Sequence, residues 1–381
     1  MHPSRSHHLP THRPELLWTC VLADAVTHLS WSPSGRSLAV GVADGTVHLL
    51  AETGREVTRH TTSSTVSITA MRWDPSSPLT VGRTDGVVVV GANETRRALT
   101  HRGEVTDLAW HPPSGHLAVA TSHDLAIYDR RLNREAEHCF QAQPLAKVAW
   151  LSGPRPASHS LAVSQNETLS WYPDAPGIDS RRHHAMPGRT RSMAPDPSGR
   201  YLAVGDFTGV LRIFDPQLDG VTEICGYDGR IDHVSWAPTG THLAAASSAD
   251  LTLCSASDTS DSPESADGGE TTVPRSLVAH EAPISALSHA PITRTSASAL
   301  LASADLDGMV MLWNPASTQL LRAIKLRAGV LALAWHPAKP LVSVGLIDGR
   351  VLTMTAPPAA RPAPDPTRCM HRPPRPFPNP R

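Results

Sequence analysis

Short stretches in which polar and apolar residues alternate recur along the chain and predict β-strands. Residues 105–110, Val-Thr-Asp-Leu-Ala-Trp, alternate in a way that is typical of a strand whose two faces meet different surroundings. A second run follows, apolar and small throughout, as in residues 38–41, Leu-Ala-Val-Gly, which predicts a strand buried on both faces. A tight turn such as Asp44-Gly45 and a third apolar run complete the unit. No segment has the 3.6-residue period of a helix, so the pattern predicts an all-β protein.

The buried second strand returns eight times. Its copies begin at Leu38, Leu79, Leu117, Leu161, Leu202, Leu243, Leu300 and Leu341. Successive copies are 41, 38, 44, 41, 41, 57 and 41 positions apart. A period near 41 residues is typical of a four-stranded propeller blade. We therefore predict a single β-propeller of about eight four-stranded blades, with seven blades as the alternative.

Residues 300–314, Leu-Leu-Ala-Ser-Ala-Asp-Leu-Asp-Gly-Met-Val-Met-Leu-Trp-Asn, resemble a WD repeat. Trp313-Asn314 stands where the family has Trp-Asp, and the resemblance extends in degenerate form over residues 15–355. It implies a propeller fold and a non-catalytic scaffold that presents its loops to partner proteins. It also implies a buried structural network of four side chains in the seventh repeat. The matching positions are His280, Ser303, Asp307 and Trp313.

The two ends of the chain and one long spacing interrupt the repeat. Residues 16–22 are strand-like and precede the first repeat, so we expect them to close the ring as the outer strand of the last blade. The acidic, polar stretch 255–274 is predicted to be a flexible loop within the propeller at 15–355. Residues 1–14 are predicted to be disordered, and so is the tail 356–381, which is rich in Pro and Arg.

The composition limits which partners and which cellular compartment we expect for the protein. The formal net charge is −1, without the basic excess that a nucleic-acid partner requires. No signal peptide and no apolar run of about 18 residues is visible, which predicts a cytoplasmic protein without membrane contact. The five cysteines include no Cys-x-x-Cys pair and fit a reducing compartment. Three lysines among 34 basic residues, with abundant Ala, Pro and Arg, indicate GC-rich coding and a bacterial origin.

The sequence contains none of the common catalytic or nucleotide-binding motifs. We therefore predict no catalytic residues, no cofactor and no metal, and we interpret the protein as a non-enzyme. Two alternatives stay open. The 21 histidines, with the pair His183-His184 near Arg189 and Arg191, would suit an accessory protein that handles a metal or an anion. A propeller enzyme with an active site in its channel is the other, because a fold alone excludes no activity.

The residue at the tip of the hairpin between the second and third strands is unusual in three repeats. Phe207, Leu306 and Ile347 occupy such tips, where packing does not call for a large apolar side chain. Exposed apolar residues that lie together tend to mark a binding surface. We hypothesise a partner site at these three residues, flanked by Arg83 and His123, on a protein that is monomeric on its own. The partner proteins themselves are not indicated by the sequence.

Overall fold

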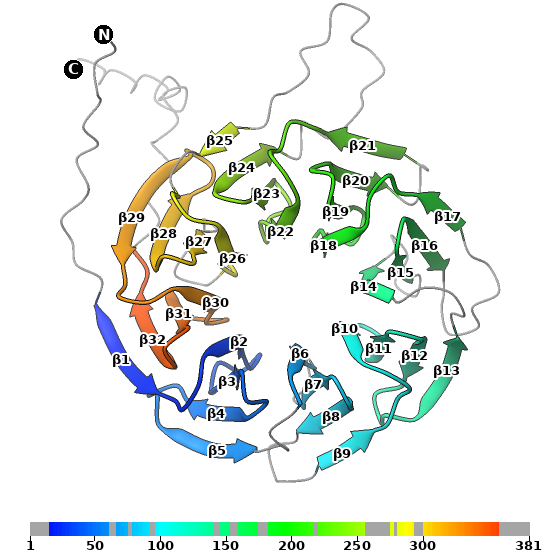
Figure 1. Ribbon diagram of the computed structural model, residues 1–381, viewed down its shortest axis with the longest axis horizontal. Helices are drawn as coiled ribbons and strands as arrows, with labels where there is room; N and C mark the ends of the chain where they lie inside the picture. The colour runs from blue at the N-terminus through cyan, green and yellow to red at the C-terminus, as the bar shows by residue number, and fades with distance from the viewer. Residues whose placement is uncertain are drawn as a thin grey trace, which may run out of the picture.

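The fold is a closed ring of eight antiparallel four-stranded sheets, the blades of a propeller (Figure 1). The computed structural model describes residues 15–60, 66–74, 78–90, 96–139, 145–152, 159–173, 182–215, 220–255, 275–277, 280–292 and 300–357. Within these ranges every regular element is a strand. No helix there could therefore span a membrane. The predicted eight-bladed, all-β architecture is confirmed, and the seven-bladed alternative is wrong.

Each blade contributes one strand to each of four concentric layers. The inner strands are β2 (Val26–Trp31), β6 (Ile68–Trp73), β10 (Val105–His111), β14 (Leu145–Ser152), β18 (Thr190–Pro195), β22 (Ile231–Trp236), β26 (Ile284–His289) and β30 (Val330–Trp335). The second strands are β3 (Ser37–Val42), β7 (Leu79–Arg83), β11 (His116–Thr121), β15 (His159–Gln165), β19 (Leu202–Asp206), β23 (His242–Ser247), β27 (Leu301–Asp305) and β31 (Leu341–Leu346).

The third strands are β4 (Val47–Ala51), β8 (Gly86–Val90), β12 (Asp124–Tyr128), β16 (Thr168–Pro173), β20 (Leu211–Asp215), β24 (Asp250–Ser255), β28 (Met309–Asn314) and β32 (Arg350–Thr355). The outer strands are β5 (Glu56–His60), β9 (Arg96–Leu99), β13 (Arg134–Cys139), β17 (Arg182–Ala185), β21 (Gly220–Ile224), β25 (Arg275–Leu277), β29 (Gln319–Lys325) and β1 (Leu16–Val21). We number the blades 1 to 8 in the order of their inner strands, so β1 belongs to blade 8.

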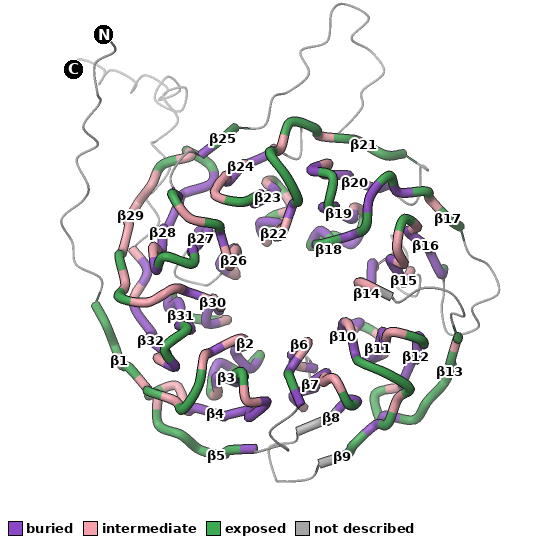
Figure 2. Tube along the Cα trace, viewed as in Figure 1, coloured by how far each residue is buried: buried purple, intermediate pink, exposed green. Residues whose placement is uncertain are grey.

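Burial follows these layers because apolar runs occupy the second and third strands. Figure 2 shows the middle of each blade largely buried, whereas the outer strands are mostly exposed or half-buried. The apolar clusters lie between neighbouring blades. In one cluster Ala203 and Ile213 of blade 5 pack with Ile231 and Leu243 of blade 6. The small residues of the second strand allow adjacent sheets to approach closely, and their burial supplies the main favourable term of folding.

Tryptophans at the ends of inner strands connect consecutive blades. The indole N–H of Trp73 donates to the carbonyl oxygen of Ser30 at 2.9 Å, from blade 2 to blade 1. Trp335 of blade 8 makes the same bond to Ser288 of blade 7 at 3.0 Å. Equivalent bonds run from Trp150 to Ala109 and from Trp236 to Ala194. Three of these four tryptophans, Trp73, Trp236 and Trp335, stand in Trp-x-Pro sequences, which therefore mark contacts between consecutive blades.

The ring closes as the sequence predicted, with β1 paired to β32 from Leu16–Met354 to Val21–Arg350. β1 also contacts blade 1, because the indole N–H of Trp18 donates to the carbonyl oxygen of Glu52 at 2.8 Å. The first and last segments of the propeller thus share one sheet and hold both neighbouring blades. Apart from Ser255, Ala356 and Pro357, the predicted segments 1–14, 255–274 and 356–381 fall outside the described residues, and their disorder stays a prediction.

Buried histidines predict a dependence of stability on pH. Burial, with a contribution from the charge of Arg72, lowers the pKa of His28 to about 4. Burial, with the charge of His242, lowers the pKa of His289 to about 3. In the unfolded chain these rings take up protons below about pH 6.5. In the folded protein they stay neutral until a lower pH. The stability that the neutral rings contribute is therefore complete above about pH 6.5 and falls as the pH drops towards 4.

Each ring should lower the free energy of unfolding by up to about 1.4 kcal/mol per pH unit in that window. Urea unfolding at pH 7.5, 6 and 5 measures this slope. The variant His289→Gln should show a smaller slope than the wild type. Equal slopes for the two proteins would contradict the assignment to His289.

Candidate interaction surface

The hairpins between second and third strands form one face of the ring, which we call the hairpin face. The backbone N–H of Phe207 donates to the carbonyl oxygen of Arg189 at 3.0 Å, just before β18. The N–H of Ile347 donates likewise to Gly329 at 3.0 Å, just before β30. Each tip is thus held against the connection that enters the inner strand of its own blade. These tips join the second and third strands, so they lie outside the inner layer that lines the channel.

Three large apolar side chains stand exposed on the hairpin face, as the sequence predicted. Phe207 and Leu306 are each 48% exposed, and Ile347 is 56% exposed. Their backbones are fixed by hydrogen bonds, so the exposure belongs to an ordered surface. The cost of leaving such residues in water makes this face a candidate for a protein partner.

Leu306 and Ile347 lie on adjacent blades and are joined through one glycine. A side chain at Gly329 would collide with the carbonyl oxygen of Leu306, so the two backbones are in close contact. The carbonyl oxygen of Gly329 accepts the hydrogen bond from Ile347. The backbones that carry the two exposed side chains therefore approach each other across the boundary between blades 7 and 8.

Phe207 is separated from that pair by blade 6 and has a cationic neighbour. The guanidinium carbon of Arg191 lies 5.9 Å from the centre of the Phe207 ring. Arg191 also pairs with Asp232 of blade 6, at 2.7 Å between Nε and Oδ1. Burial alone would raise the pKa of Asp232, but hydrogen bonds from Arg191 and Arg230 lower it below its ordinary value. The pair keeps a charged group beside an exposed aromatic ring, a combination typical of binding hot spots.

The predicted flanking residues lie elsewhere on the ring. Arg83 is in blade 2 and makes two 2.9 Å hydrogen bonds to the carboxylate of Asp85 in its own hairpin. His123 is in blade 3, where its Nδ1 lies 2.7 Å from the hydroxyl of Ser122. Blade 1 separates Arg83 from Ile347, and blade 4 separates His123 from Phe207. The structure does not bring all five residues together. Leu306 and Ile347 are the contiguous pair.

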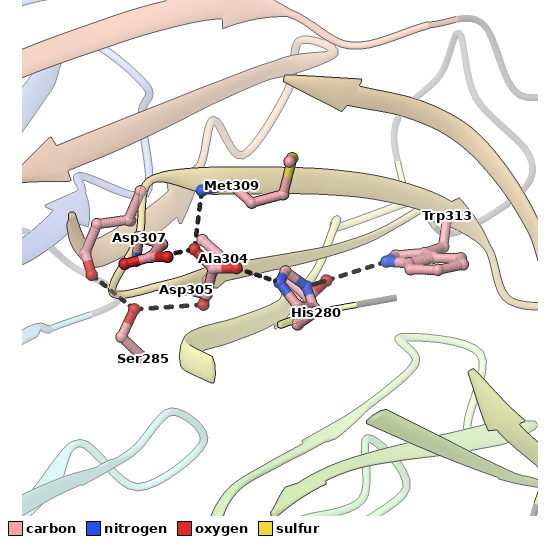
Figure 3. A network of polar contacts seen from close by, with 9 residues as sticks. His280, Ser285, Ala304, Asp305, Asp307, Met309 and Trp313 are labelled. Carbon is pink, nitrogen blue, oxygen red and sulfur yellow. Dashed lines mark hydrogen bonds and ion pairs between the residues drawn. The ribbon is translucent and has the colours of Figure 1, made fainter. Parts of the chain in front are cut away.

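The four-residue network of blade 7 is present with one member exchanged (Figure 3). The indole N–H of Trp313 donates to Ser303 Oγ at 3.0 Å, and Ser303 Oγ lies 2.7 Å from His280 Nε2. His280 Nδ1 lies 2.8 Å from Oδ2 of Asp305. A carboxylate only accepts, so Nδ1 carries the proton and Nε2 can accept from the serine hydroxyl.

The prediction of Asp307 as the acidic member was wrong. Asp307 is exposed in the hairpin turn, whereas Asp305 ends β27 with its side chain buried. Oδ1 of Asp305 also accepts the backbone N–H groups of Asp307 at 3.0 Å and of Met309 at 2.8 Å. One carboxylate thereby holds both the turn and the imidazole. Asp206 accepts the N–H groups of Thr208 and Val210 in the same way in blade 5.

A depression at the far ends of the inner strands was not predicted. Its volume is about 480 Å³, and its walls come from blades 1 and 5–8. They include Trp31, Trp236, Trp335, His289 and three prolines, and no carboxylate. The inner strands begin beside the hairpin face and end here, so the depression opens on the opposite side. In the sequence, the Trp-x-Pro repeats indicate the tryptophans of this depression. These side chains come together only because the blades form a closed ring.

The histidine and arginine cluster does not converge on one point. His183 and His184 are neighbours in β17 and lie on opposite faces of that strand. Nδ1 of His183 lies 2.9 Å from a serine hydroxyl of β16, while His184 contacts the ring of Phe214. Arg189 donates to Asn166 Oδ1 at 2.7 Å. Among the described residues of the cluster, these side chains thus have different partners.

Comparison with families of known proteins supports the WD-repeat class for this chain. Residues 12–76 match the family described as the anaphase-promoting complex subunit 4 WD40 domain, and residues 93–129 and 271–314 match the WD domain, G-beta repeat. Together with the eight-bladed ring, these matches support a WD-repeat family for the chain. They confirm the WD resemblance in that coarser form.

The similarity to individual proteins is limited either in the length that it covers or in sequence identity. The human U3 small nucleolar RNA-associated protein 4 homolog is 31% identical over 147 residues, which span 37% of this chain and 21% of that protein. The chain thus covers about a fifth of the relative's length. The crystal structure of the computationally designed Ika8 protein has a TM-score of 0.68, covering 88% of this chain and 98% of that one at 17% identity. This second likeness supports the fold alone.

Proposed function

We propose that the protein is a non-catalytic scaffold that binds partner proteins through the hairpin face. The exposure of Leu306 and Ile347 at the tips of adjacent blades carries the proposal, and Phe207 with Arg191 provides a second anchor. WD-repeat relatives support the same class of function. A rigid ring with ordered, apolar tips loses little conformational entropy on binding, which favours association.

The two alternative functions, a channel enzyme and an accessory protein that handles a metal or an anion, have less support. A channel enzyme would need acid–base groups around a cavity, but the walls of the depression combine indoles, prolines and one imidazole whose pKa burial lowers to about 3. The cluster at His183 and His184 has no common focus. A cytoplasmic location, a monomeric state, a bacterial origin and the absence of nucleic-acid and membrane partners stay predictions.

The double variant Leu306→Ser/Ile347→Ser should lose its partner proteins. Full-length protein would be used for affinity purification from the native host, with mass spectrometry of the retained proteins. Removal of two buried interface anchors should weaken binding at least about tenfold. Phe207→Ser measures the second anchor separately.

Matched controls exist on other surfaces of the chain. Val57 on outer strand β5 and Ile292, which follows β26 beyond the far end of that inner strand, are 58% and 50% exposed. Val57→Ser and Ile292→Ser should retain the same partners as the wild type. Retention of all partners by Leu306→Ser/Ile347→Ser would refute the proposed surface.

A further inference from the structure

Three side chains able to bind a metal meet at the edge of blade 3. Asp124 begins β12 and is directly opposite Cys139, the last residue of β13, while Ala126 is opposite Glu137. Residues two apart in a strand share a face, so Asp124, Glu137 and Cys139 all lie on one side of this sheet. A carboxylate oxygen of each acid and the sulfur of Cys139 lie within 4.8 Å of one another.

One oxygen of the buried Asp124 carboxylate, Oδ2, has no hydrogen-bond donor. Asp124 is 2% exposed, and no nitrogen or hydroxyl donor reaches its Oδ2 atom. A hydrogen bond with this carboxylate, and its charge, raise the pKa of the Cys139 thiol, but a thiol is a weak donor. A buried carboxylate oxygen without a strong donor is costly, so the site favours a bound positive charge.

The charged groups around the cluster do not fully balance the charge of the Asp124 carboxylate. Arg134 pairs with Glu137, at 2.6 Å between Nη1 and Oε2. The charge of Arg102 acts on Cys139. Neither arginine donates a hydrogen bond to Oδ2 of Asp124. Glu137 and Cys139 are exposed, so a cation can reach the cluster from solvent.

We propose that Asp124, Glu137 and Cys139 bind a divalent transition-metal ion of the zinc type. One sulfur and two carboxylate oxygens form a donor set of intermediate softness, which suits Zn²⁺, Co²⁺ or Cd²⁺ better than Ca²⁺ or Mg²⁺. Binding displaces the thiol proton to solvent and forms a metal–sulfur bond, without oxidation or reduction. The exposed Glu137 and Cys139 side chains can rotate inward to bring the donors to bonding distance, and water completes the coordination. The cluster lies at the hairpin-face end of blade 3, away from Leu306 and Ile347 on blades 7 and 8, and the proposal does not depend on that surface.

Cobalt titration of the full-length protein, purified without a histidine tag, tests this site. Co²⁺ bound by a thiolate gives a charge-transfer absorption that carboxylates alone do not give. The band should appear in the wild type, vanish in Cys139→Ser and disappear from the wild type when Zn²⁺ is added. Glu137→Gln should weaken Co²⁺ binding at least about tenfold.

The matched control is Cys225→Ser, because Cys225 is also an exposed free cysteine. Its band should equal that of the wild type. Circular dichroism should show the same β-sheet signal for both serine variants, since both thiols lie at the surface. A band that persists in Cys139→Ser, or no band in the wild type, would overturn the proposal. Partner capture by Cys139→Ser without Co²⁺ reports separately on the scaffold function.

Discussion

Deletion of residues 1–22 should convert the protein into an aggregating species without cooperative unfolding. The deletion removes β1 and exposes the whole edge of β32, from Arg350 to Met354, with its unpaired backbone groups. It also removes Trp18, which packs against the buried cluster between blades 8 and 1. An open sheet edge beside exposed apolar side chains promotes association between chains. Size-exclusion chromatography and thermal unfolding should show loss of the monomer peak and of the transition.

A shorter deletion provides the control. Removal of residues 1–14 leaves β1 complete, so this variant should elute and unfold like the full chain. The substitution Trp18→Ala keeps the strand and removes only its contacts to blade 1, and it should give a soluble protein with reduced stability. A folded, monomeric product of the 1–22 deletion would show that β1 does not close the ring.

Asp305→Ala should cause the largest loss of stability of any single substitution discussed here. It leaves Nδ1 of buried His280 and two turn N–H groups without their acceptor. Removal of one partner from a buried polar network costs about 3 kcal/mol. Urea unfolding at pH 7.5 should show the loss as a lower transition midpoint. This loss of stability arises from the groups left unpaired. An intact network stabilises the fold by less than its disruption destabilises it.

Asp307→Ala is the matched control, two residues away in the same hairpin. Its carboxylate is exposed, so the free energy of unfolding should change by no more than about 0.5 kcal/mol. The reverse order, with Asp307→Ala the more damaging variant, would indicate that the usual family position holds the imidazole. The pair of variants therefore separates the two assignments of the acidic residue.

The candidate sites could be predicted only in part from the sequence. The exposure of Phe207, Leu306 and Ile347 followed from their places in the hairpins, because an apolar residue at a turn has no core to enter. The flanking role of Arg83 and His123 stays a prediction, because one blade separates each of them from the nearest of the three apolar tips. The cluster at Asp124, Glu137 and Cys139 gave no sequence signal, since its donors meet through cross-strand pairing.

The sequence by itself determined the all-β class, the eight repeats and the closing strand. Strand alternation, turn residues and a 41-residue period are local properties, and each acts within one blade. The tertiary structure alone decided that Asp305 holds His280, that Leu306 adjoins Ile347, and that tryptophans of several blades form one depression. Those outcomes depend on which face of a strand a side chain occupies, and a shift of one residue reverses it. Only the packing of one blade against the next selects that face.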